Sequence, residues 1–143
     1  MLLSFVMFRA AATRSGLFRM YSTSSAISVP SLMRSVTIDT GKRPSSALSI
    51  DQAPTPTLSA EDTTPYVLVK VRAFGLNRMD LMQREGQYPI PPGASPIMGV
   101  EFSGEVAALA QHGAPDLNLG DAVFGLAHGG AYAEYIRVPA SMI

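Results

Sequence analysis

The sequence predicts a mainly β fold, a small and partly open β-barrel with one short helix, and three observations support this. Short runs in which apolar and polar residues alternate recur along the chain. Stretches rich in glycine and proline separate these runs. Only one segment, residues 77–85, has apolar residues at helical spacing. Many short strands, regular turns and a single short helix are typical of small β-barrels.

The composition indicates one globular domain preceded by a basic segment. The chain has 143 residues, 47% hydrophobic and 15% charged, which is enough to bury a core. The net charge is zero, but residues 1–38 contain arginine and no acid, so the remainder is acidic and unsuited to binding nucleic acid. The absence of cysteine excludes disulfides and thiolate metal sites. No apolar run approaches the roughly 20 residues of a membrane span.

Residues 1–32 have the composition of a mitochondrial targeting segment. They are rich in Arg, Ser and Ala and contain no Asp or Glu. The apolar stretch precedes Arg9, whereas a secretory signal places its positive charge first. Arg19-Met20-Tyr21-Ser22 resembles a mitochondrial processing site. We therefore expect a location in the mitochondrial matrix. The alternatives are an unprocessed tail on a cytoplasmic protein and an erroneous start upstream of Met33.

The first part of the body alternates strands and turns. Residues 35–39 include β-branched side chains, which predict a strand, and residues 41–44 predict a turn. A second strand is expected at residues 47–52, followed by a proline- and threonine-rich loop at residues 54–65. Residues 66–73 are the clearest strand, because three valines alternate there with residues that include a lysine and an arginine.

The short helix is expected to begin at Asn77, a residue that caps helix N-termini well. Asp80 would lie in the first turn, where a carboxylate suits the helix dipole. Met79 and Met82 can share one helical face, which we expect to be part of the core. Gly86 is placed to end the helix.

The second part of the body begins with a stiff loop and continues with strands. Several prolines make residues 88–93 extended, because each fixes its own φ and restricts the residue before it. Residues 97–109 predict a strand whose glycines indicate a bulge or a close backbone approach. After a loop at residues 111–118, residues 121–127 and 131–138 predict two more strands.

The body also carries a series of short motifs in a fixed order: Asn77-Arg78, Asp80-Leu81-Met82-Gln83-Arg84, Gly86-Gln87-Tyr88, Pro91-Pro92-Gly93-Ala94-Ser95, Gly99-Val100-Glu101, Gly120-Asp121-Ala122-Val123 and Gly129-Gly130-Ala131-Tyr132-Ala133-Glu134-Tyr135. In this order and spacing, the series resembles the medium-chain dehydrogenase/reductase superfamily. More narrowly, it resembles the zinc-free quinone oxidoreductase branch. The resemblance implies a GroES-like, partly open barrel over residues 33–143, in agreement with the strand pattern.

The resemblance also implies a second domain that this sequence does not show. In that family a nucleotide-binding Rossmann domain follows the barrel, and no G-x-G-x-x-G turn after a strand occurs here. We therefore expect a domain truncated at residue 143. NADPH would serve the complete enzyme but would not bind this chain tightly. A homo-oligomer is expected only with the missing domain.

By resemblance, the chemistry is hydride transfer from the nicotinamide to a quinone or an activated carbonyl or alkene, a small-molecule substrate. The resemblance assigns Asn77 to cofactor binding, although helix capping alone is the alternative. Tyr88 is the expected catalytic residue, donating a hydrogen bond to a carbonyl that gains negative charge, unless its ring only packs over the prolines. Glu101 either orients a group in the site or pairs with Arg78 or Arg84.

Zinc is not expected. Zinc-dependent relatives have a cysteine at the position of Asn77 and a histidine at that of Val100. The two histidines of the chain, His112 and His128, lie in turn-like segments without ligand spacing. A quinone is already electrophilic, so a Lewis-acid metal is dispensable.

Two alternatives stay open. One is a fragment of a mitochondrial enoyl-thioester reductase, which has the same architecture, although the run from Asn77 to Arg84 fits the quinone branch better. The other is a non-catalytic protein, a lone barrel or a remnant. A strand, a glycine-rich turn and a helix encoded downstream of Ile143 would favour the enzyme.

Overall fold

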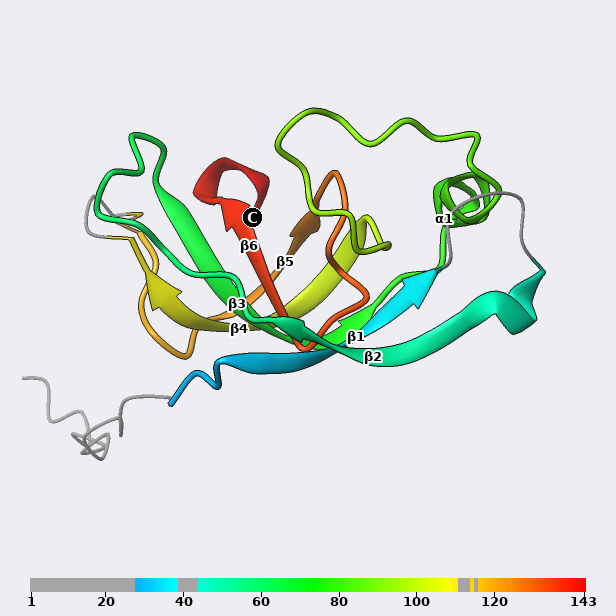
Figure 1. The fold of residues 1–143 in the computed structure, drawn as a ribbon. Helices are drawn as coiled ribbons and strands as arrows, with labels where there is room; N and C mark the ends of the chain where they lie inside the picture. The colour runs from blue at the N-terminus through cyan, green and yellow to red at the C-terminus, as the bar shows by residue number, and fades with distance from the viewer. Residues whose placement is uncertain (1–27, 39–43, 111–113, 115) are drawn as a thin grey trace, which may run out of the picture.

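Two antiparallel sheets and one helix form the fold of the computed structural model, which describes residues 28–38, 44–110, 114 and 116–143 (Figure 1). The first sheet is a ribbon of β1 (Leu32–Ile38) and β2 (Leu48–Pro54). The second has the order β5-β4-β3-β6, with β3 at Tyr66–Phe74, β4 at Glu101–Leu109, β5 at Ala122–Leu126 and β6 at Tyr135–Pro139. Helix α1 spans Arg78–Arg84, and the 3-10 turns η1 and η2 span Ser45–Ala47 and Ala140–Met142.

Strand β3 is central because it pairs with β4 on one side and β6 on the other. Its Val67 and Val69 are fully buried, and Val106 of β4 and Val138 of β6 pack with them around Phe102. The alternation in the sequence therefore predicts the buried face correctly.

The β1–β2 ribbon closes against the segment that precedes β6. The Val36 N–H donates to the Tyr132 carbonyl over 2.8 Å, and the Glu134 N–H donates to the Arg34 carbonyl over 3.1 Å. In Figure 1 the ribbon runs beneath the four-stranded sheet, toward the side where α1 lies. The mainly β, partly open fold with one short helix that the sequence predicts is thus confirmed.

Helix α1 is confirmed, but its predicted inner face is wrong. Asn77 is the N-cap, and Gly86 follows the last turn with a φ of 71°. Met79 is 38% exposed and Met82 is half-buried, whereas Asp80 and Gln83 are buried. The helix therefore turns two polar side chains toward the protein, and this polar face has to find hydrogen-bonding partners there.

Two strands begin later than the sequence predicts. Residues 97–100 are not in a strand because Gly99 has a φ of 93°. Residues 131–134 precede β6, since the N–H groups of Ala131 and Tyr132 donate to Gly99 and Met98. The expected targeting segment, most of the turn at residues 41–44, and His112 lie outside the described residues. No helix in the described ranges is long and apolar enough to cross a membrane.

Candidate functional site

Asn77 lies between the end of β3 and the start of α1, and hydrogen bonds hold both its backbone and its side chain. Its backbone N–H donates to Oδ2 of Asp80 over 2.6 Å, and its carbonyl accepts the Asp80 N–H over 3.1 Å. Its Nδ2 donates to Oε2 of Glu101 over 2.9 Å. The amide therefore has a fixed direction, and its Nδ2 carries a second N–H that can donate to a further acceptor.

Glu101 opens β4 and accepts from Asn77, so the predicted pairing with Arg78 or Arg84 is not observed. Gly75 faces the Glu101 carboxylate so closely that a Cβ at residue 75 would overlap it. The sequence motif around Gly99 identifies this carboxylate as a candidate site residue, but only the fold shows which residue it contacts.

Two adjoining cavities lie on this side of the protein, and Glu101 lines the second of them. The first has a volume of about 620 Å³ and is lined by Met79, Val100, Phe124, Gly125, Leu126, Ala127, His128, Ser141, Met142 and Ile143. The second, of about 490 Å³, is lined by Ala73, Phe74, Gly75, Glu101, Phe102, Ser103, Phe124, Gly125 and Leu126. Both sizes are those of ligand sites, and the lining is mostly apolar. Phe124 and Leu126 line both cavities and are 79% and 66% exposed.

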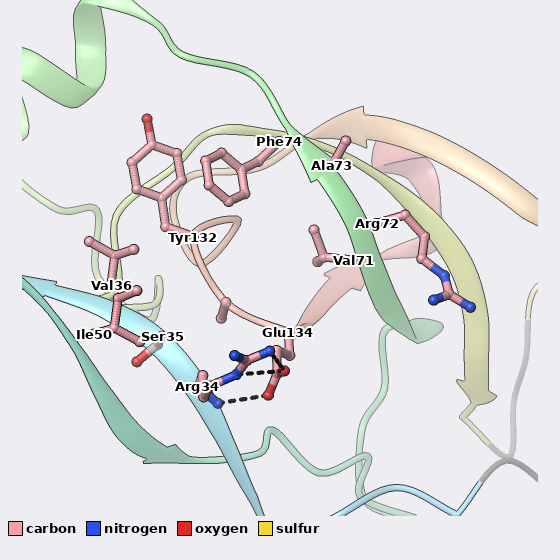
Figure 2. Close-up of a pocket in the computed structure, with 11 residues that line it drawn as sticks. Arg34, Ser35, Val36, Ile50, Val71, Arg72, Ala73, Phe74, Tyr132 and Glu134 are labelled. Carbon is pink, nitrogen blue, oxygen red and sulfur yellow. Dashed lines mark hydrogen bonds and ion pairs between the residues drawn. The ribbon is translucent and has the colours of Figure 1, made fainter.

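A third cavity, of about 320 Å³, lies between the β1–β2 ribbon and the end of β3 (Figure 2). Phe74 lines both this cavity and the second one. Arg34 and Glu134 form an ion pair in its lining, with 2.7 Å between Nη2 and Oε1. Hydrogen bonds from the Arg34 side chain and backbone lower the pKa of Glu134.

Asp80 and Tyr132 form a buried hydrogen bond behind Asn77. The Tyr132 hydroxyl donates to Oδ2 of Asp80 over 2.9 Å, and the two residues are 6% and 3% exposed. Burial, followed by the hydrogen bond to Asp80, raises the pKa of Tyr132, so the phenol stays protonated at neutral pH. The sequence gives no signal for this contact, because the residues are far apart in the chain and their motifs are separate.

Tyr88 is placed apart from this arrangement. It is half-buried in the loop after α1 and lines none of the three cavities. Within the described residues its hydroxyl makes no hydrogen bond. The structure thus brings Asn77 to Glu101 and Asp80 but does not bring Tyr88 to them.

The described residues contain no group of three or more His, Asp or Glu side chains that could hold a metal ion. Val100 is buried and apolar, and His128 is exposed. The polar residues in the lining are His128 and Ser141 in the first cavity and Glu101 and Ser103 in the second. Asn77 contacts the second lining through its hydrogen bond to Glu101, and this amide–carboxylate pair suits the carboxamide or carbonyl of an organic ligand.

Comparisons with known proteins agree on a family. The model of the alcohol dehydrogenase GroES-like domain matches residues 64–143. The chain is 34% identical over 99 residues to the trans-enoyl reductase caaB of Aspergillus niger, covering 64% of this chain and 25% of the relative. It is 36% identical over 77 residues to the "probable quinone oxidoreductase" of Schizosaccharomyces pombe, covering 54% of this chain and 23% of the relative.

Solved structures give the same picture. The quinone oxidoreductase from Coxiella burnetii superposes with a TM-score of 0.65 at 28% identity, over 78% of this chain and 36% of that one. A mycobacterial protein solved in complex with NADPH superposes with a TM-score of 0.60 at 30% identity, over 77% and 31%. The chain spans about a quarter of the curated relatives and about a third of these structures.

Proposed function

The chain belongs to the alcohol dehydrogenase GroES-like domain family, in the quinone oxidoreductase-like branch of the medium-chain dehydrogenases/reductases, and from this premise we propose that it supplies one wall of an NADPH-dependent reductase site. The nicotinamide would transfer a hydride to a quinone-like acceptor without zinc. Residues 33–143 would form this domain, and residues 1–32 would direct the protein to the mitochondrial matrix.

The observation that carries the proposal is the fixed Asn77 amide, which donates to Glu101 in the lining of the second cavity. Nδ2 carries a second N–H, which can donate to the carboxamide of a nicotinamide lying against the wall. Every strand pair in the described residues is antiparallel, which leaves the nucleotide end of NADPH without a βαβ unit there. Tight NADPH binding should therefore need a further domain.

A hybrid protein tests this proposal. Residues 33–143 replace the matching part of the mycobacterial relative that was solved with NADPH. We expect the hybrid to bind NADPH and to reduce 1,4-benzoquinone, while the 143-residue chain alone does not bind NADPH at micromolar concentration. Asn77→Ala should lower kcat/KM by about 10- to 100-fold, because it removes the amide that would orient the nicotinamide carboxamide. Asn118→Ala, in an exposed turn, is the control.

The same hybrid tests Tyr88. Tyr88→Phe removes only the hydroxyl. If the hydroxyl bonds the reacting carbonyl, its loss should lower kcat/KM by an amount that corresponds to roughly 1–3 kcal/mol of activation free energy. Equal kcat/KM with an unchanged melting temperature would make Tyr88 a packing residue. A hybrid in which Asn77→Ala has no effect would contradict the proposed site.

A second acceptor class is supported by one comparison, the 34% identity to a trans-enoyl reductase. An enoyl thioester presents an activated alkene in place of a quinone. Activity of the hybrid on a trans-2-enoyl thioester, with none on quinones, would favour this alternative.

A further inference from the structure

Asp80 accepts more hydrogen bonds than helix capping alone explains. Its Oδ2 accepts from the Asn77 N–H over 2.6 Å and from the Tyr132 hydroxyl over 2.9 Å. Its Oδ1 is buried without a hydrogen-bond partner in the described part of the chain. Burying a carboxylate is costly, and a packed apolar side chain would stabilise the core as well. The polar contact therefore serves orientation more than stability.

Tyr132 is a rigid donor for this carboxylate. Its backbone N–H donates to the Met98 carbonyl over 2.9 Å, and its own carbonyl accepts the Val36 N–H over 2.8 Å. Its ring lies against Phe74, with 4.5 Å between the ring centroids, and it packs so closely on Gly99 that no Cβ fits there. Figure 2 shows the hydroxyl pointing away from the Arg34–Glu134 ion pair.

We propose that Tyr132 and Asp80 are positioning residues for Asn77. Through its Oδ2, Asp80 connects the fixed Tyr132 hydroxyl to the backbone of Asn77, at the first turn of α1. This sets the position from which the Asn77 side chain reaches Glu101, which lines the second cavity. The catalytic consequence rests on the proposed function, whereas the structural consequence is measurable in the 143-residue chain.

The first test is NMR on the full chain, with no ligand. In Tyr132→Phe we expect the two side-chain N–H signals of Asn77 to shift and to exchange faster with solvent. The matched control is Tyr135→Phe, which removes a hydroxyl from a second buried tyrosine that makes no side-chain hydrogen bond with the described residues. Unchanged Asn77 signals in folded Tyr132→Phe overturn the proposal.

Asp80→Asn serves where Tyr132→Phe fails to fold. It keeps the shape but offers a weaker, uncharged acceptor to both donors. A change in the chemical shifts of the Asn77 backbone and side-chain N–H groups supports the proposal. Unchanged chemical shifts overturn it.

The second test uses the hybrid enzyme. Tyr132→Phe should lower kcat about tenfold, the usual value of one hydrogen bond to a charged group, while the KM for NADPH changes little. A purely structural role would change the melting temperature and leave kcat of the folded enzyme intact. If Asn77→Ala has no effect in the hybrid but the Asn77 signals move in Tyr132→Phe, the proposed function fails and the positioning remains.

Discussion

At the scale of single residues, one glycine determines how closely the Tyr132 ring packs against the backbone. Gly99 has a φ of 93°, a conformation that side chains rarely adopt, and a Cβ there would overlap the ring and lie 2.8 Å from the Tyr132 nitrogen. The sequence predicts a strand through this position. The glycine instead breaks the strand and lets the tyrosine ring approach the backbone.

We expect Gly99→Ala to destabilise the protein by more than Gly93→Ala. Gly93 has a similar φ of 81° but has no atom within 4 Å of a built Cβ, so its substitution costs only the left-handed conformation, about 1–2 kcal/mol. Gly99→Ala adds the steric overlap with Tyr132. Urea denaturation of both variants measures the difference, and equal losses would show that the ring moves aside freely.

The candidate site was predictable from the sequence only where its residues are close together in the chain. Asn77 and Asp80 are three residues apart, and their capping relation follows from helix geometry. Glu101 was expected either to orient a group in the site or to pair with Arg78 or Arg84, and the structure shows it accepting from Asn77. Tyr132 was not a candidate. Their contacts depend on how β4 and the loop before β6 pack against α1, which local patterns do not determine.

At the scale of elements, the strand interiors followed from the alternation of residues, but several ends did not. β3 and β5 are close to their predicted ranges. Alternating valines define β3, whereas β5 is a short apolar run in which Phe124 and Leu126 are exposed. β6 begins four residues later than predicted, at Tyr135, since the preceding residues bond to β1 and to the segment before β4. Those partners are invisible in a local sequence pattern.

The attachment of β1 should depend on pH through Glu134. Hydrogen bonds from Arg34 lower the pKa of Glu134 below its ordinary value of 4.5. Such a carboxylate stabilises the fold above its unfolded pKa, and the contribution disappears as pH falls through the folded pKa. The urea concentration at the unfolding midpoint should therefore be higher for the wild type than for Glu134→Gln at pH 7. This difference should shrink toward pH 3.

The control is Glu61→Gln, which removes an exposed carboxylate that has no ion pair in the described residues. A difference between wild type and Glu134→Gln that stays constant from pH 7 to pH 3 would exclude the Arg34–Glu134 pair as its source. The pair is largely exposed, so salt should weaken its effect.

At the scale of the whole molecule, some of the most exposed apolar residues belong to the candidate site or its immediate neighbourhood in the chain. Leu76, Phe124 and Leu126 are 82%, 79% and 66% exposed. The sequence predicted the mainly β, GroES-like fold, because family motifs and strand patterns agreed. It could not predict the shape of the exposed wall, which depends on the packing of β5 against η2.

Import into mitochondria is the prediction that concerns the chain as a whole. Residues 1–32 fused to a fluorescent reporter should carry it into the matrix, because the basic, acid-free composition is confined to the start of the chain. Replacing Arg9, Arg14 and Arg19 by glutamine should abolish import. A reporter that remains cytosolic with the natural residues would rule out the targeting role.

The central place of β3 also has a consequence for biosynthesis. Tyr66 in β3 pairs with Pro139 in β6, so β3 leaves the ribosome long before its second partner exists. Until then one side of β3 presents unpaired backbone groups, the kind of edge that recruits strands from other chains. Lys70 and Arg72 place positive charge on that strand and discourage such pairing. In the finished sheet Arg72 pairs with Glu105 of β4 over 3.0 Å, so the same charge can protect the nascent chain first and join two strands afterwards.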